Sequence, residues 1–289
     1  MTHWKTGRFE IDLAEPRVMG IVNLTPDSFS DGDPAQTPAR ALATCERLLA
    51  EGADILDLGG ESSRPDADPV DLDTELGRVL PVLREALRFG RPISVDTAKP
   101  EVMRAALDLG ADIVNDIGAL RATGALEAVA SHPACGVCLM HMRGTPRSMQ
   151  GETDYADMVG EIAAFLGERV AAVEAAGVAR GRIVVDPGVG FGKTPAQNLE
   201  LLSRQQELLG LGVPLLVGWS RKSTLARLAR VSGTPPAERS VGQRATLDAA
   251  SVAASLLAVQ RGARIVRVHN VAAMVAALAV WKASPGARG

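Results

Sequence analysis

The chain has 289 residues and a formal net charge of −3, and 46% of its residues are hydrophobic but only 3% are aromatic. This composition is typical of a folded globular enzyme and excludes a disordered, highly charged chain. The slightly negative charge gives no reason to expect nucleic-acid binding. With 5 Lys against 26 Arg, the position of each lysine is unusually informative.

The sequence contains no run of about 18 uncharged apolar residues, so we expect no transmembrane helix. Its first residues also lack the apolar stretch of a signal peptide. Three cysteines in a chain of this length are typical of a reducing compartment, and we expect a cytoplasmic protein. Cys135 and Cys138 form an isolated CxxC pair without a second ligand pair at zinc spacing. We expect two buried small residues there rather than a metal or redox site.

Short, β-branched and almost continuously apolar runs recur along the chain, and each is followed by a turn and an amphipathic stretch. Continuous apolar character is typical of strands that are buried on both faces of a parallel sheet. The eight candidate strands are 18–23, 55–59, 93–96, 113–116, 137–141, 183–186, 215–218 and 265–269. The clearest intervening helix spans 154–177, where apolar residues recur at helical spacing and Gly177 is the expected stop.

Eight strand–helix units without a linker-like segment predict a single domain over residues 1–289, folded as an α/β (β/α)8 TIM barrel. We expect residues 1–16 to form a short extension that covers the bottom of the barrel and residues 285–289 to be a frayed tail. Length alone also suits two domains. A doubly wound open sheet is the alternative, but it would place a glycine-rich fingerprint after the first strand, where this chain has NLTP at 23–26.

In a TIM barrel the functional residues lie at the carboxyl ends of the strands and in the loops that follow them. Nearly every predicted strand ends on a polar or ionisable residue, which turn formation explains at one or two positions but not at eight. These residues are Asn23, Asp57, Asp96, Asn115, Asp116, His141, Asp186, Ser220, Arg267 and His269. We therefore expect an active site at this end of the barrel.

Three loops at the predicted mouth, 23–32, 59–65 and 186–195, contain more Gly, Pro, Ser and Asp than a connection requires. Such loops are usually mobile surface segments or active-site lids. The third loop is not a P-loop, because the Walker spacing puts its first glycine at Pro187. We therefore reject nucleoside triphosphate binding. Lys193 in this loop and Lys99 after the third strand are expected to be solvated.

The last two strands end in candidate anion-binding segments. Residues 218–223 (GWSRKS) run into a helix, whose first N–H groups attract anions; an ordinary serine cap with solvated cations is the alternative. Arg267 and His269 point the same way on a strand and supply two positive donors, and Asn270 is expected to cap the last helix. The residues alone indicate an enzyme that acts on a polar heterocycle with a phosphorylated leaving group.

The ordered set of motifs from about residue 18 to about residue 283 resembles the dihydropteroate synthase family. The matching segments are MGIVNLTPDSFSDG at 19–32, GGESSRP at 59–65, SVDT at 94–97, IVND at 113–116, MHM at 140–142, DPG at 186–188, SRKS at 220–223 and RVH at 267–269. The resemblance implies a step of folate biosynthesis that joins 6-hydroxymethyl-7,8-dihydropterin diphosphate to p-aminobenzoate, giving 7,8-dihydropteroate and diphosphate. It also implies Mg²⁺ as cofactor and competition by sulfonamides.

The resemblance further assigns each site residue a role. The implied catalytic residues are Asp96, Lys222 and Arg267. The implied pterin-binding residues are Asp96, Asn115, Met140, Asp186, Gly218, Lys222 and Arg267. Diphosphate is implied to contact Asn23, Ser63, Arg267 and His269, with Asn23 also touching Mg²⁺. The implied p-aminobenzoate-binding residues are Phe29, Arg64, Pro65, Phe191, Lys222 and Ser223.

A dissociative reaction follows from the resemblance. The diphosphate leaves once its growing charge is neutralised. Asp96 stabilises the positive charge on the pterin methylene, and the neutral aromatic amine attacks without a strong general base. The chain departs from the family pattern at Ser63 (usually threonine), Asn270 (commonly aspartate) and Gln243 (commonly a small hydroxyl residue).

Two alternative functions remain at this point: a methyltetrahydrofolate–corrinoid methyltransferase-like enzyme, and a non-catalytic pterin-binding paralogue. The first has no use for the loops 23–32 and 59–65, and the second should have broken a substrate loop or lost Lys222. The alanine-rich segment 245–259 suits either a homodimer interface, which the family commonly has, or a wholly intramolecular helix. We expect a homodimer.

Overall fold

The computed structural model describes residues 2–25, 37–64 and 67–284. Its main sheet contains eight strands in the order in which the chain visits them, and each is parallel to its neighbours. These strands are β3 (Arg17–Asn23), β4 (Ile55–Gly59), β5 (Ile93–Asp96), β6 (Ile113–Asp116), β7 (Gly136–Met140), β8 (Ile183–Asp186), β9 (Leu216–Val217) and β10 (Ile265–Val268).

The sheet curls into a barrel because its last strand pairs with its first. In that pairing Ile265 lies opposite Arg17. Between β8 and β9 the ring is completed by a single bridge, in which Val185 lies opposite Leu215. The predicted TIM barrel is therefore confirmed, and the expected strand positions agree with the observed ones to within about two residues. The largest difference is at β9, which keeps only two ladder residues because the chain turns away at Gly218.

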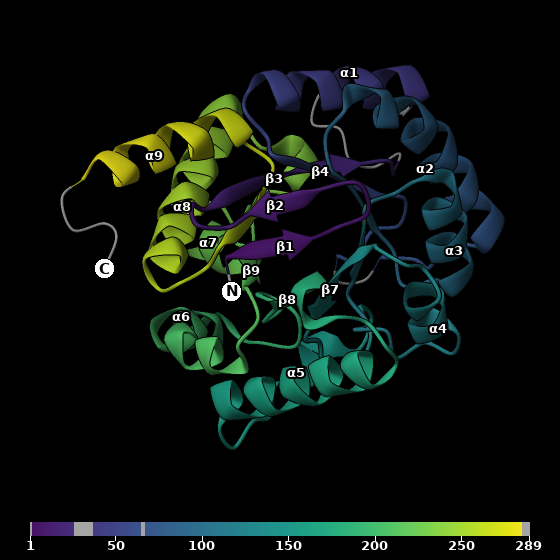
Figure 1. Cartoon of the computed structure of the whole chain (residues 1–289). Helices are drawn as coiled ribbons and strands as arrows, with labels where there is room; N and C mark the ends of the chain where they lie inside the picture. Colours follow the sequence, from purple (N-terminus) through teal and green to yellow (C-terminus); the bar gives the residue numbers. More distant parts are fainter. Residues whose placement is uncertain (1, 26–36, 65–66, 285–289) are drawn as a thin grey trace.

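Helices surround the barrel on its outside (Figure 1). They are α1 (Pro38–Ala50), α2 (Leu72–Ala86), α3 (Pro100–Leu109), α4 (Ala125–Ala130), α5 (Met158–Ala175), α6 (Pro195–Arg204), α7 (Ser223–Leu228), α8 (Val241–Gln260) and α9 (Val271–Ala283). Short 3₁₀ turns lie at η2 (Leu87–Phe89), η3 (Met149–Gly151), η4 (Arg180–Arg182), η5 (Gln205–Leu211) and η6 (Pro236–Glu238). Aliphatic side chains fill the layer between strands and helices.

Local signals in the sequence account for several helix ends. Gly177 adopts a left-handed φ of 95° just after α5, as expected of a helix stop. Helix α5 begins later than predicted, at Met158, because the Glu161 carboxylate accepts N–H bonds from the chain just before it. Asn270 caps α9 by accepting the N–H of Ala273 at 3.1 Å, which confirms the expected cap.

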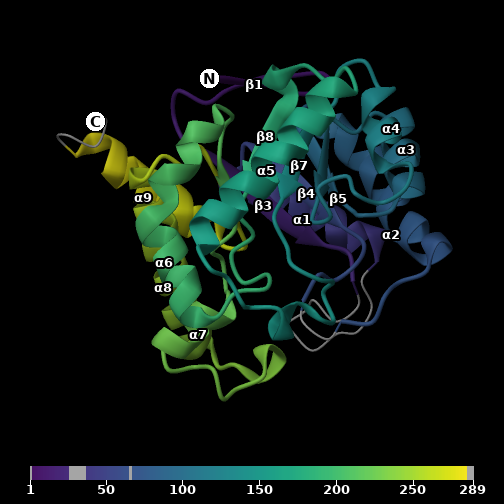
Figure 2. The same ribbon diagram turned by 90° about the horizontal axis from the view of Figure 1, so that it is seen from below.

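The first residues of the chain form a hairpin that closes one end of the barrel. Strands β1 (His3–Lys5) and β2 (Glu10–Asp12) pair antiparallel and lie across that end (Figure 1). In β1 the fully buried Trp4 packs on residues near the beginnings of the barrel strands and donates its indole N–H to the Arg182 carbonyl at 2.9 Å. Figure 2 shows this hairpin and α7 at opposite ends of the barrel.

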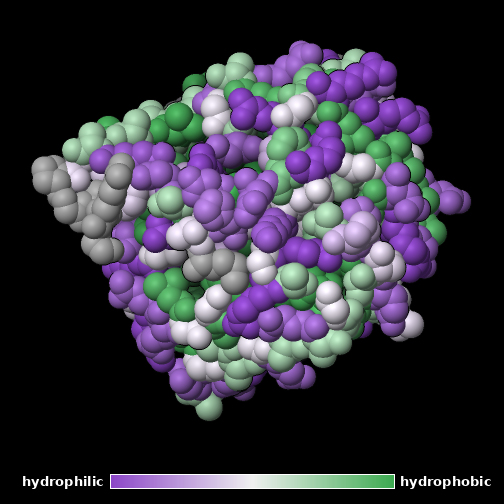
Figure 3. Space-filling model, viewed as in Figure 1, coloured by the Kyte–Doolittle hydropathy of each residue, from purple (hydrophilic) through white to green (hydrophobic). Residues whose placement is uncertain are grey.

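The face that carries the hairpin exposes mainly hydrophilic residues, with hydrophobic residues in small separate groups (Figure 3). Scattered apolar side chains of this kind are normal on a protein surface. Among the helices of the described ranges, none combines the length and the apolar character needed to span a bilayer.

One buried carboxylate anchors the hairpin. Asp112 is fully buried and accepts the backbone N–H of Arg8 at 2.9 Å and its Nε at 3.0 Å, while the Arg8 Nη2 lies 2.7 Å from the other carboxylate oxygen. That second oxygen also accepts the N–H of Ile93, the first residue of β5, at 2.9 Å. The Asp112 carboxylate therefore links the hairpin to the first residue of a barrel strand.

Replacing Asp112 by alanine should lower the free energy of unfolding by about 3 kcal/mol, since several buried donors lose their acceptor. Urea unfolding of Asp112→Ala measures this loss. The exposed Asp12 at the end of β2 provides a control, because Asp12→Ala should change stability by less than about 1 kcal/mol. Equal effects of the two substitutions would show that the hairpin is not anchored by Asp112.

Candidate active site

A cavity of about 440 Å³ lies at the carboxyl ends of the barrel strands, opposite the hairpin. Every barrel strand supplies a lining residue at its end or directly after it. These residues are Asn23, Gly59, Asp96, Asn115, Met140, Asp186, Gly218 and Arg267. The cavity therefore lies at the end of the barrel where the sequence predicts the active site.

The cavity brings together every described residue to which the resemblance assigns a role, whereas the strand-end residues Asp57, Asp116 and His141 do not line it. The residues brought together are Asn23, Ser63, Arg64, Asp96, Asn115, Met140, Asp186, Phe191, Gly218, Lys222, Ser223, Arg267 and His269. Two further predicted residues, Phe29 and Pro65, lie outside the described residues. The shared cavity shows that the described residues are neighbours; their individual roles remain predictions.

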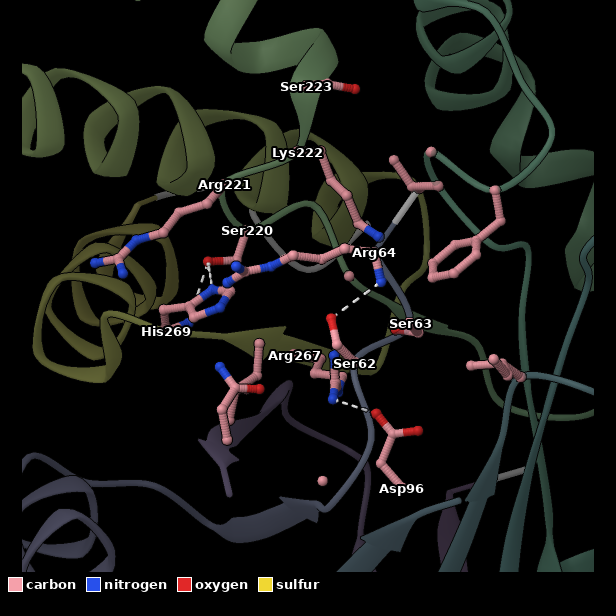
Figure 4. Close-up of a pocket in the computed structure, with 18 of the residues that line it drawn as sticks. Ser62, Ser63, Arg64, Asp96, Ser220, Arg221, Lys222, Ser223, Arg267 and His269 are labelled. Carbon is pink, nitrogen blue, oxygen red and sulfur yellow. Dashed lines mark hydrogen bonds and ion pairs between the residues drawn. The ribbon is translucent and has the colours of Figure 1, made fainter. Parts of the chain in front are cut away.

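Arg267 lines the cavity and is paired with two carboxylates. Its Nε is 2.6 Å from Asp57 Oδ2. Its Nη2 is 2.6 Å from Asp96 Oδ2 (Figure 4). Asp57 is fully buried, and its Oδ2 also accepts the side-chain amide of Asn115 at 3.2 Å. Burial opposes the positive charge of Arg267, but the two carboxylates outweigh it and raise its pKa. The cluster links strands β4, β5, β6 and β10.

Both carboxylates of the predicted pterin site have raised pKa values. Burial raises the pKa of Asp96 to about 7, against the opposing effect of Arg267. Burial also raises the pKa of Asp186, whose Oδ1 accepts the N–H of Gly188 at 2.7 Å, an interaction that works in the opposite direction. Perturbed carboxyl groups that face one cavity are typical of a functional site.

Lys222 reaches into the cavity from the start of α7. Its ammonium lies 4.1 Å from the centre of the Phe191 ring, which is a cation–π contact. Burial lowers the pKa of Lys222 to about 8, with Asp186 acting in the opposite direction and Arg267 in the same one. Lys222 is itself the N-cap of α7 and contributes no side-chain cap, so the serine cap considered as an alternative does not form, and Ser223 is the first helical residue.

The turn before α7 holds an unusual backbone conformation. Arg221 has a left-handed φ of 57°, which a side chain with a Cβ seldom adopts. Its N–H donates to Ser251 Oγ at 2.9 Å, and its guanidinium makes two bonds to Asp248 at 2.8 and 3.0 Å. Asn270 also donates to Asp248, at 3.0 Å. Helices α8 and α9 thereby fix the turn that presents Lys222.

His269 is not the positive donor that the sequence suggested. Its Nδ1 lies 2.9 Å from Ser220 Oγ, which also accepts the His269 N–H at 3.1 Å (Figure 4). Burial lowers the pKa of His269 well below its usual value, and the nearby cations, Arg221 first and then Arg267, lower it further. The imidazole is therefore neutral near pH 7 in the protein without substrate.

The expectation that Lys193 and Lys99 are solvated was wrong. Lys193 is only 2% exposed and is hydrogen-bonded beneath the cavity wall. Lys99 pairs with the cavity-lining Glu61 and, at 2.6 Å, with the fully buried Glu75. A lysine in a glycine-rich loop gives no sequence signal of burial; the small number of lysines in this chain was the only available hint.

The cysteine pair behaves as expected. Cys135 and Cys138 are both buried free thiols, and burial raises the pKa of each.

In the ranges that the structure describes, no cluster of three His, Cys, Asp or Glu side chains is arranged to hold a metal ion.

Comparison with known proteins identifies the family. The sequence profile described as "Pterin binding enzyme" matches residues 19–269. The dihydropteroate synthase of Neisseria meningitidis serogroup C is 50% identical over 97% of this chain and 96% of its own length. A solved structure of Xanthomonas albilineans dihydropteroate synthase with 4-aminobenzoic acid superposes with a TM-score of 0.87, at 48% identity, covering 98% of this chain and 99% of the other.

A second solved structure shows a reaction product. Burkholderia cenocepacia dihydropteroate synthase complexed with 7,8-dihydropteroate superposes with a TM-score of 0.84, at 47% identity, covering 98% of this chain and 96% of the other. The likeness thus extends over nearly the whole length of each protein and includes every barrel strand that lines the cavity. The chain belongs to the dihydropteroate synthase family of pterin-binding enzymes.

Proposed function

We propose that the cavity joins 6-hydroxymethyl-7,8-dihydropterin diphosphate to p-aminobenzoate and releases 7,8-dihydropteroate and diphosphate. The observation that carries this proposal is the convergence of buried carboxylates and cations on one cavity, in a chain whose full-length relatives are dihydropteroate synthases. The solved relatives with 4-aminobenzoic acid and with 7,8-dihydropteroate support the choice of substrates. No feature of the described residues favours a corrinoid methyltransferase or a non-catalytic binder.

The pterin would lie over the cavity floor. Asp96, Asn115 and Asp186 offer oxygen acceptors to the N–H groups along one edge of the ring. Lys222 is placed to donate to the ring's oxygen and nitrogen side. Met140 lines the same cavity and is 5% exposed. Its side chain would present an apolar surface to the heterocycle.

The diphosphate would lie toward Arg267, Ser63 and His269. Arg267 remains positively charged because its pKa is raised, and hydroxyl and imidazole groups add donors of the kind that bind phosphate. The neutral His269 can donate an N–H to an oxyanion or take up a proton from a bound diphosphate. Because nearby cations lower its pKa, an arriving anion reverses part of that effect.

The described residues fit Mg²⁺ as a cofactor that is held mainly by substrate. Mg²⁺ usually keeps several waters and binds through one or two protein oxygens together with substrate phosphates. Asn23 at the end of β3 lines the cavity and offers an amide oxygen. A bound Mg²⁺ would neutralise charge on the diphosphate leaving group. Protein side chains would bind the two substrates and stabilise the cation that forms on the pterin.

The second substrate would enter beside Lys222. Phe191 gives this part of the cavity an apolar wall, and Arg64 and Ser223 add polar groups at its rim. The ammonium of Lys222 and the first N–H groups of α7 attract the carboxylate of p-aminobenzoate. The amine end of the molecule would then approach the pterin methylene.

The reaction is a substitution at the pterin methylene carbon. The carbon–oxygen bond to diphosphate breaks and its electron pair leaves with the diphosphate, while the ring spreads the positive charge that remains. Asp96 stabilises this cation as a carboxylate, because opposite charge nearby is worth most in a buried site. The amine nitrogen of p-aminobenzoate then forms the new carbon–nitrogen bond and loses its proton to solvent.

We also propose that the enzyme is a cytoplasmic homodimer. Helices α8 and α9 pack on each other and carry Leu257 and Val280, which are 42% and 70% exposed. Apolar groups on neighbouring helices are typical of a subunit interface. The three buried free thiols support a reducing location.

Purified protein with Mg²⁺ should release diphosphate only when both substrates are present, because the methylene cation needs the amine to trap it. A coupled diphosphate assay measures release, and chromatography identifies the product. Omission of either substrate is the control. Absence of 7,8-dihydropteroate from the complete mixture would overturn the proposed function.

Asp186→Asn should weaken pterin binding about tenfold to a hundredfold, since the ring loses a charged hydrogen-bond acceptor. The melting temperature should hardly change, because an amide oxygen can still accept the N–H of Gly188. Calorimetric titration and thermal unfolding measure the two quantities.

Asp116→Asn is the matched control for this substitution. Asp116 is also a buried aspartate at the end of a barrel strand, β6, and it accepts two backbone N–H groups, at 2.6 and 2.7 Å, but does not line the cavity. This variant should bind pterin as the unmodified protein does. A collapse of the Asp186→Asn melting temperature would instead assign Asp186 a structural role.

The pH profile of kcat/KM should be a narrow bell. On the acid side activity rises as Asp96 loses its proton, since burial has raised its pKa to about 7. On the alkaline side activity falls as Lys222 loses its proton, since burial has lowered its pKa to about 8. Steady-state rates from about pH 6 to about pH 9 measure both limbs. In Lys222→Arg the alkaline limb should disappear from this range; an unchanged limb would contradict the assignment.

A further inference from the structure

Lys193 is a buried lysine to which the proposed reaction assigns no part, and burial lowers its pKa to about 7. Its Nζ lies 2.9 Å from the Gly188 carbonyl, 2.9 Å from the Phe191 carbonyl and 3.0 Å from His141 Nδ1. An ammonium has three N–H donors, and these three acceptors match them in number. The side chain is only 2% exposed, and each N–H of its ammonium form has a hydrogen-bond acceptor within the protein.

His141 serves as an acceptor in this cluster rather than as a second cation. It is buried, and burial lowers its pKa to about 2, with Lys193 and Arg143 adding to the effect. Its ring packs edge-on against Phe165, with 5.1 Å between the ring centroids. The neutral imidazole can thus accept a hydrogen bond at Nδ1 from the lysine.

The cluster fixes the loop that follows β8. Gly188 has a φ of 69°, and a Cβ there would lie 1.9 Å from the His141 carbonyl oxygen, so only glycine fits this close approach. The bend turns the carbonyls of Gly188 and Phe191 toward Lys193. Lys193 thus ties together two carbonyls of a segment rich in glycine.

The far side of the same loop is tied to α7. Asn198 is 1% exposed, accepts the N–H of Gly190 at 2.7 Å and donates to Thr224 Oγ1 at 3.2 Å. Between these two attachments the Phe191 ring lies against Lys222, at 4.1 Å from its ammonium. The loop therefore positions one face of the cavity wall.

We infer that Lys193 is a positioning residue that holds the loop 187–193, so that Phe191 covers Lys222 and shapes the p-aminobenzoate side of the cavity. The inference rests on the proposed function, because it takes the Phe191 wall as part of the second-substrate site. Lys193 touches no substrate in this account and acts through Phe191 alone.

Lys193→Met keeps the length of the side chain and removes its charge and all three donors. The KM for p-aminobenzoate should rise about tenfold or more, because two buried carbonyls lose their donor and the loop relaxes. The Kd for the pterin diphosphate should change less than about threefold. Lys5→Met, at an exposed position on the hairpin at the other end of the barrel, is the control and should leave both constants unchanged.

A double-mutant cycle tests whether Lys193 acts through Phe191. Phe191→Ala alone should raise the KM for p-aminobenzoate, and adding Lys193→Met should raise it less than about twofold further. Lys193→Gln, which retains two N–H donors, should give an intermediate KM; it replaces Lys193→Met in the cycle if that variant does not fold. Independent, multiplying effects of the two substitutions would overturn the inference, and so would an unchanged KM in Lys193→Met.

Different results would contradict the proposed function and the positioning role of Lys193. If the unmodified protein makes no 7,8-dihydropteroate, the proposed function is wrong. If it does make the product, and the Lys193 variants lower kcat and raise both binding constants together, the role of Lys193 is one of general stability rather than of positioning.

Discussion

The ion cluster around Arg267 is the interaction on which the site depends. A charge that is removed from water is costly unless an opposite charge and hydrogen bonds accompany it. Arg267 meets this condition with Asp57 and Asp96, which come from two neighbouring strands far away in the sequence. Asn115 joins through Asp57, so its amide is oriented by the same cluster. Any movement of β10 would therefore leave buried carboxylates without a partner.

This arrangement explains why the cavity can hold groups of both signs. The pKa of Asp96 is raised by burial and partly restored by Arg267, while Lys222 keeps a lowered pKa beside Asp186. Among the described residues that line the cavity, six are Arg or Lys and three are Asp or Glu, so the side chains around it are mainly cationic. The slightly negative net charge of the chain is thus no obstacle to anionic substrates.

Much of the fold could be predicted from the sequence, because strands buried on both faces leave continuous apolar runs and barrel geometry then places their ends together. The protonation state of His269 could not be predicted from the sequence, since it depends on burial and on which cations the fold brings near the imidazole. Asp57 was recognised as a strand end, but its partner Arg267 is 210 residues away. Lys193 was misjudged because glycine in a loop suggests mobility. Here the left-handed glycines allow a sharp bend that buried hydrogen bonds then fix. Phe29 and Pro65 lie outside the described residues, so their predicted roles remain predictions.

The closure of the barrel has a consequence for synthesis on the ribosome. Strand β3 is synthesised early, but one of its two neighbours in the sheet is β10. The pairing of Arg17 with Ile265 therefore cannot form until nearly the whole chain has been synthesised. The hairpin likewise cannot place Trp4 until Arg182 has been made. Pairings between such distant residues form slowly, and an unpaired strand edge attracts other chains. Until its last strand emerges, the nascent chain therefore carries an open edge on β3.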